Sequence, residues 1–223
     1  MTRKLCSLLL SGLLMLALTA CAHPPVYSAK EIHGKIVDDA TGLPLEGVII
    51  VAQWELYQIG LGDGGHKGWM VNIIEVVTDN MGNYVIPGWG PRPRPPFNYL
   101  DNSDPKLIIF KIGYFPEELF NPLRSEENIN HDSMRTSQWA GKTIKLKKFD
   151  GGSLEKYAGQ LSSIRGGLAN DGHKLRSYPR MFLALAAEQR RLDALGLKPG
   201  YGVSASSVES LNESDQKFLR EYK

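Results

Sequence analysis

Between residues 31 and 149, apolar side chains recur at every second position in short runs separated by turn residues. In the clearest run Val48, Ile50, Ala52, Trp54 and Leu56 share one face, and the opposite face turns polar at Gln53 and Glu55. A period of two predicts strands, and this one should bury a single side. The predicted strands are 31–38, 48–57, 69–79, 83–87, 106–112 and 143–149. Such a series favours an all-β sandwich.

After Gly151 and Gly152 the apolar period changes to about 3.6 residues, which predicts helices. A second helix should begin at Pro179 and end before Gly196, and a third should follow the loop at 200–207. We expect this extension, 150–223, to pack on itself or on the strands, with docking of a partner as the alternative. The stripe of the first helix comprises Leu154, Tyr157, Leu161, Ile164 and Leu168, with Ser153 as its cap.

The turns between the strands carry a recognisable pattern. It consists of Gly34 to Asp38, Thr41 to Val48, Thr78-Asp79 with Gly82 and Tyr84, and Gly113-Tyr114. In this order the pattern resembles the carboxypeptidase regulatory-like domain. The resemblance implies a transthyretin-like β-sandwich over 31–149, of a kind that is usually non-catalytic and serves as a structural or recognition module. The stretches 60–68 and 87–105 depart from the family pattern.

The first twenty residues read as an export signal. Arg3 and Lys4 precede the uncharged run 5–18, which is shorter than the roughly twenty apolar residues that a spanning helix needs. The following Leu18-Thr19-Ala20-Cys21 resembles the lipobox of bacterial lipoproteins. The resemblance implies cleavage before Cys21, a diacylglycerol thioether on its sulfur and a third acyl chain, such as palmitate, on its amine. A plain signal with an incidental cysteine, or a short buried helix, is the alternative.

The residues after the predicted cleavage site predict the membrane to which the protein is sorted and a linker before the folded body. Ala22, rather than an aspartate, follows Cys21, which under the enterobacterial sorting pattern implies the outer membrane, facing the periplasm. The segment 21–30 should be an extended tether, because it contains Pro24 and Pro25.

Composition narrows the classes of function. The chain is 42% hydrophobic and 22% charged, which is ordinary for a globular protein. Its net charge of +2 comes entirely from Arg3 and Lys4 in the predicted signal, so the remaining body is neutral and a poor binder of nucleic acid. Cys6 would leave with the signal, and Cys21 alone cannot form an internal disulfide.

One loop stands out as a candidate binding site. Proline-stiffened segments lose little entropy on binding, and aromatic rings stack on sugars or on extended peptides. The competing interpretation is that the rings pin the loop onto the sandwich as a satellite core. The candidate ligand-binding residues are Trp89, Arg92, Arg94, Phe97 and Tyr99.

Catalytic signals are weak. No histidine has a glutamate at the His-x-x-Glu spacing of a zinc carboxypeptidase, so we predict no metal site and no cofactor. The chain is therefore predicted to be a non-catalytic, membrane-anchored envelope protein that binds or scaffolds an envelope protein or glycan. A carbohydrate- or peptidoglycan-binding module using Trp89 and Tyr99 is one alternative. A hydrolase, or an accessory subunit of an envelope enzyme, with His66, His131 or His173 beside a carboxylate, is another.

Overall fold

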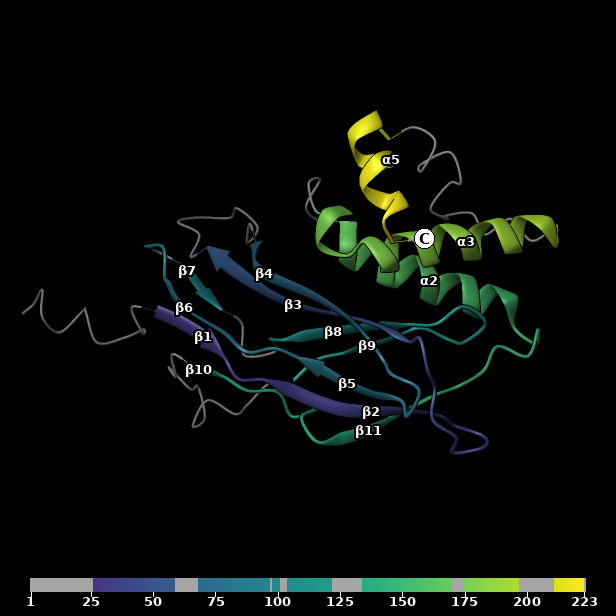
Figure 1. Cartoon of the computed structure of the whole chain (residues 1–223), viewed down its shortest axis with the longest axis horizontal. Helices are drawn as coiled ribbons and strands as arrows, with labels where there is room; N and C mark the ends of the chain where they lie inside the picture. Colours follow the sequence, from purple (N-terminus) through teal and green to yellow (C-terminus); the bar gives the residue numbers. More distant parts are fainter. Residues whose placement is uncertain are drawn as a thin grey trace, which may run out of the picture.

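The computed structural model describes residues 26–58, 68–96, 98–100, 104–121, 134–169, 175–196 and 211–222. This part of the chain is mainly β, with three sheets and three α-helices (Figure 1). The strands are β1 Val26–Ala29, β2 Ile32–Asp38, β3 Ile49–Gln58, β4 Gly68–Val77, β5 Asn83–Ile86, β6 Trp89–Pro93, β7 Asn98–Leu100, β8 Lys106–Phe110, β9 Glu117–Leu119, β10 Met134–Arg135 and β11 Lys142–Leu146. The helices are α2 Leu154–Ala169, α3 Pro179–Ala194 and α5 Glu213–Arg220, with a 3-10 turn at Leu175–Ser177.

The strands form two layers. In one layer the sheets β10-β1-β6 and β11-β2-β5 follow each other end to end, because only Lys30 and Glu31 separate β1 from β2. The other layer is the five-stranded sheet β4-β3-β8-β9, with β7 paired to the end of β3. The hairpin of β3 and β4 pairs along its whole described length, with a register shift after Trp54.

The main core lies between the layers. The inward face of β3 supplies Ile50, Ala52, Trp54 and Leu56, and Val48 directly before the strand continues the same face, as the alternating pattern predicts; all five are buried. The opposite layer contributes apolar residues of β1, β2, β5 and β11 to the same cluster. Burial of these side chains is the principal stabilising term of the fold.

The outward face of the five-stranded sheet is buried as well, in contrast to the one-sided burial that the sequence predicts. Ile49 and Val51 pack with Ile108 of β8 against α2 and α3, which lie over this face in Figure 1. Even Gln53 is only 1% exposed. The alternation of residues in a strand does not indicate whether helices about a hundred residues later in the chain bury its second face. The helical extension therefore packs on the strands.

The body begins earlier than the sequence predicts. Val26–Ala29, which fall in the predicted tether, form β1 and pair with β6 on one side and β10 on the other. Tyr27 and Ala29 are buried in the main core. The residues of this segment give only a short strand signal by themselves. Pairing with β6 and β10 and the burial of Tyr27 and Ala29 stabilise it as a strand.

The residues of the family-like pattern lie in turns and close contacts at one end of the molecule, which we call the turn end. Asp38 Oδ1 accepts hydrogen bonds from the amides of Ala40 and Thr41, at 3.1 and 2.8 Å. Gly34 lies opposite Tyr84, and a Cβ at Gly34 would be 2.6 Å from the tyrosine oxygen. These residues serve local backbone geometry and packing there.

None of the helices in the described part of the chain is long and apolar enough to cross a membrane. Among them, α3 receives its N-terminal cap from another element. Glu75 of β4 accepts hydrogen bonds from the amides of Met181 and Arg180, at 2.8 and 3.1 Å. Burial raises the pKa of the Glu75 carboxyl, although these amides and the Arg180 charge act to lower it. The carboxylate thus ties the helix layer to the sheet.

Candidate functional site

The predicted binding loop is partly built into strands. Trp89 and Arg92 belong to β6, and Arg94 follows directly. Tyr99 belongs to β7, where its backbone pairs with Tyr57 of β3, but its side chain and the whole of Phe97 lie outside the described residues.

Trp89 and Arg92 bridge the two layers. The half-buried indole of Trp89 meets Trp54 edge to face, with ring centroids 5.5 Å apart. The Arg92 guanidinium lies 5.2 Å from the centroid of the Trp89 ring and donates to the carbonyl of Val71 in β4. Arg92 itself remains exposed. Tryptophan and arginine thus contribute to packing, and their role in binding a ligand stays a prediction.

Two further arginines lie around Tyr27, where β1 begins. Arg94 Nη1 donates to the carbonyl of Asn98 at 3.3 Å, and Arg135 Nη2 donates to the carbonyl of Leu100 at 2.7 Å. The Arg135 guanidinium is 5.9 Å from the centroid of the Tyr27 ring. Burial raises the pKa of Tyr27, opposed by the Leu100 backbone and by the charges of Arg94 and Arg135. We call Arg92, Arg94 and Arg135 with the start of β1 the arginine end.

Carboxylates near the end of β3 are engaged with other groups. Asp104 Oδ2 accepts from the amide of Glu55 at 2.9 Å, and the Tyr57 hydroxyl donates to Glu55 Oε2 at 3.1 Å. Within the described ranges, no ion pair joins Arg92 or Arg94 to an acidic side chain. The arrangement is therefore suited to anions, because a guanidinium has five donors and the backbone carbonyls occupy few of them.

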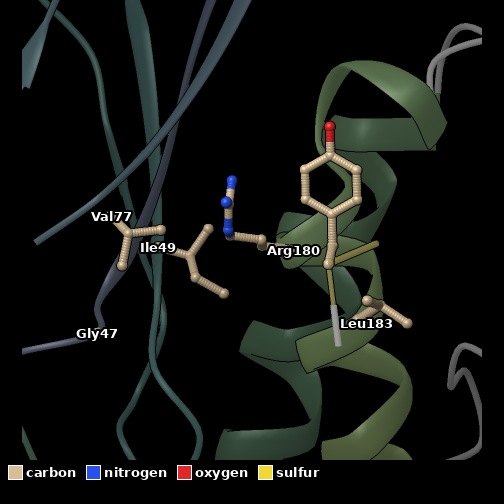
Figure 2. A pocket seen from close by; sticks show the side chains of 6 residues that line it. Gly47, Ile49, Val77, Arg180 and Leu183 are labelled. Carbon is tan, nitrogen blue, oxygen red and sulfur yellow. The ribbon is translucent and has the colours of Figure 1, made fainter. Parts of the chain in front are cut away.

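A second candidate is an open cleft between the sheet and α3. Its volume is about 450 Å³, and Figure 2 shows Arg180 between the α3 helix and the apolar side chains of Ile49 and Val77. The Arg180 guanidinium lies 5.0 Å from the centroid of the Tyr222 ring, and its Nη1 is 3.7 Å from Glu75 Oε2. The cleft is lined by Gly47, Ile49, Val77, Arg180, Leu183 and Tyr222.

Sequence reasoning missed this cleft because its walls come from four separate segments of the chain. The one local signal is Val77, the last residue of β4. Its apolar side chain is 37% exposed. An apolar floor with one guanidinium and one phenol is suited to an amphipathic segment of a partner.

A third polar cluster joins α2 to α3 but is closed. The Tyr157 hydroxyl donates to Glu188 Oε1 at 2.5 Å, and Arg191 donates to both Glu188 oxygens, at 2.6 and 2.8 Å. Glu188 is fully buried, and burial raises the pKa of Tyr157. Because no solvent reaches the carboxylate, this cluster serves to link the two helices.

The remaining sequence candidates are not brought together here. Cys21, His66, His131 and His173 all lie outside the described residues. In the ranges that the structure covers, no three side chains of histidine, cysteine, aspartate or glutamate gather in a way that could hold a metal ion.

Comparison with known proteins adds little. No family model and no curated protein sequence matches the chain. Among solved structures, the chain is similar to 3-chlorocatechol 1,2-dioxygenase from Rhodococcus opacus 1CP, at 15% identity and a TM-score of 0.26. The alignment covers 57% of this chain and 61% of the dioxygenase, so the chain spans less than two thirds of its neighbour. A likeness this low carries no argument about fold or activity.

Proposed function

We propose that this protein is a bacterial envelope lipoprotein, anchored through acyl chains on Cys21, whose β body is a non-catalytic binding or scaffolding module. The observation that carries the proposal is the short distance along the chain between Cys21 and Val26, the first residue of β1. Since β1 is paired on both sides, acylation at Cys21 would hold a folded body directly at the bilayer.

The fold proposed for this body is the transthyretin-like sandwich of carboxypeptidase regulatory-like domains. Two features support it. Gly34 makes room for Tyr84 on the neighbouring strand, and Asp79 accepts hydrogen bonds from the amides of Met81 and Asn83, at 2.9 and 2.8 Å. These contacts explain why glycine occurs at position 34 and aspartate at position 79, two of the positions that carry the resemblance.

The binding role is supported by the surfaces that the body presents. The cleft beside α3 joins an apolar floor to Arg180, and the arginine end presents guanidinium groups next to aromatic rings. Arginine and aromatic residues are enriched where proteins meet partners. The most suitable partner for the cleft is an envelope protein segment with an apolar side chain next to an acidic one.

The two alternatives gain less support. A carbohydrate module would need Trp89 and Tyr99 as exposed, coplanar rings, whereas Trp89 has Trp54 at its edge and Arg92 over its ring. A hydrolase would depend on His66, His131 or His173, which lie outside the described residues.

The proposal is tested by mass spectrometry of the N-terminal peptide from detergent-extracted protein. We expect a peptide starting at Cys21 whose mass includes a diacylglyceryl group and an amide-linked acyl chain. Cys21→Ser should keep the leader and lose both modifications. An unmodified Cys21 in the mature protein would refute the anchor.

The binding role needs its own experiment. A photo-reactive amino acid at Leu183, in the cleft, is compared in intact cells with one at Val85, an exposed apolar position on β5. We expect a discrete adduct with one envelope protein from position 183 only, and its loss when the acidic residue at the adduct site of that protein is neutralised. Equal labelling from both positions would argue against a binding site in the cleft.

A further inference from the structure

We propose that the arginine end rests against anionic phospholipid headgroups, so that the lipoprotein stands on the bilayer with the start of β1 toward the membrane. This inference depends on the proposed acylation of Cys21 and adds an orientation and a second, electrostatic contact to it. The ligand chemistry is the phosphate of a phospholipid such as phosphatidylglycerol.

The length of the chain before β1 sets the first constraint. Four residues lie between Cys21 and Val26, and the five Cα–Cα steps, at about 3.6 Å each, span at most about 18 Å. Acyl chains on Cys21 place that residue at the boundary of the hydrocarbon core, and the headgroup layer beyond it is about 6 Å thick. Val26 then lies within about 12 Å of the outer surface of the headgroups.

Strand register places the arginines at the same level. β6 runs antiparallel to β1, with Arg92 opposite Tyr27 and Pro93 opposite Val26. The chain therefore leaves β6 where it enters β1, and Arg94 comes directly after that exit. Paired strands lie about 4.8 Å apart, so Arg92 and Arg94 belong to the same end of the body as Val26, from which the chain leads back to Cys21.

The chemistry of this end fits phosphate. Arg92 is exposed and donates to the carbonyl of Val71, whereas Arg94 is half-buried, donates to the carbonyl of Asn98 and also interacts with the Tyr27 side chain. Among the described residues, no ion pair neutralises either guanidinium. A guanidinium binds phosphate through two parallel hydrogen bonds. Charge acts over only about 8 Å at physiological salt, and the short chain from Cys21 allows this end of the body to come within that distance of the headgroups.

The test uses the mature acylated protein in nanodiscs of phosphatidylcholine, with or without 30% phosphatidylglycerol, and measures backbone hydrogen exchange. We expect slower exchange in β1 and β6 in the anionic nanodiscs, and loss of this difference at high salt. Each arginine near an anionic membrane surface strengthens association with that surface about fivefold. Arg92→Gln with Arg94→Gln should therefore remove most of the difference in exchange between the two kinds of nanodisc.

The matched control carries the same charge change elsewhere. Arg190→Gln with Arg220→Gln alters two exposed arginines on α3 and α5 and should keep the lipid-dependent protection. Exchange in β3 and β8 verifies that each variant is folded. If acylated protein shows equal exchange in both nanodiscs, or if both double variants behave alike, the headgroup contact is refuted while the anchor stands. If the mass of the protein shows no acylation, the proposed function itself fails.

Discussion

The two ends of the sandwich handle charge in different ways. At the turn end, acidic side chains have partners within the chain: Lys145 Nζ lies 3.6 Å from Asp39 Oδ1, and the pKa of Asp79 is lowered mainly by the Asn83 amide and to a smaller extent by the Lys35 charge. At the arginine end, Arg92 and Arg94 have backbone carbonyls as hydrogen-bond acceptors. The first end contains an ion pair within the chain, whereas no ion pair with another described residue neutralises Arg92 or Arg94 at the second.

This difference indicates where stability and function lie. At the turn end, the side chains of Asp38 and Asp79 accept hydrogen bonds from nearby backbone amides and so fix the turns. The other end relies on the core beneath it, and Arg92 on its surface is exposed. The following predictions test that division, beginning with the largest expected effect.

The largest effect should come from the core under the arginine end. Trp54→Ala removes a fully buried indole together with the support of Trp89, and should lower the free energy of unfolding by about 3–5 kcal/mol. Urea denaturation measures it. Met81→Ala, at an exposed turn position, is the control and should change stability by no more than about 0.5 kcal/mol. A similar loss in both variants would contradict the account.

At the turn end, two glycines form a matched pair. Gly42 and Gly82 both have positive φ, of 70° and 75°. A Cβ at Gly82 would collide with the carbonyl oxygen of Ile36, whereas one at Gly42 would meet nothing. Gly82→Ala should therefore cost about 2–4 kcal/mol and Gly42→Ala about 1 kcal/mol. Equal costs would mean that backbone conformation alone, rather than close packing, requires the glycine.

The aspartates of the turn end should make stability depend on pH. The amide of Thr41 lowers the pKa of Asp38, and the amide of Asn83 lowers that of Asp79. A lowered folded-state pKa adds stability above the unfolded-state value of about 3.9, and this stability is lost as pH falls through the folded-state value. Asp38→Asn with Asp79→Asn should therefore lower the urea midpoint at neutral pH.

The comparison at low pH completes this experiment. As pH falls through the lowered folded-state pKa values, the wild-type carboxylates become protonated, so the midpoints of the two proteins should converge at acidic pH. Glu75 acts in the opposite sense, because a raised folded-state pKa adds stability that is full below the unfolded-state value and lost as pH rises. A gap that stays constant between neutral and acidic pH would contradict the prediction.

The smallest effect should come from the arginine end itself. In the absence of lipid, Arg92→Gln loses an exposed contact with Trp89 and a hydrogen bond, and should cost about 1 kcal/mol or less. Denaturation in detergent-free buffer with the acyl chains removed measures this cost. If Arg92→Gln lowered the free energy of unfolding as much as Trp54→Ala does, Arg92 would be a structural residue. The proposal that this end contacts an external partner would then be weakened.

The sequence predicted elements whose signal is local. The alternation in β3 placed its inward face correctly, and the 3.6-residue period with Pro179 and Gly196 located α3. It missed β1 and β6, because Val26–Ala29 is short and Trp89–Pro93 contains glycine and prolines, so that only pairing with other strands makes them strands.

The candidate sites show the same limit. Trp89, Arg92 and Arg94 could be singled out because they are neighbours in the sequence. The cleft at Arg180 could not, because the residues that line it come from four regions between positions 47 and 222. Arg135 joins the arginine end only through the pairing of β10 with β1. Sites assembled by long-range pairing leave no period in the sequence.

The most direct test of the account is the distance of each end from the bilayer. In the proposed mature lipoprotein Cys21 is the one cysteine and is blocked by acylation, so a fluorophore can be attached at Pro93→Cys or, at the turn end, Leu43→Cys. β1 and β2 together run about 40 Å, at about 3.3 Å per residue, which separates the two positions widely. Energy transfer to acceptor lipids should be strong from position 93 and weak from position 43. Equal transfer from both positions, or stronger transfer from position 43, would contradict an arginine end that faces the membrane.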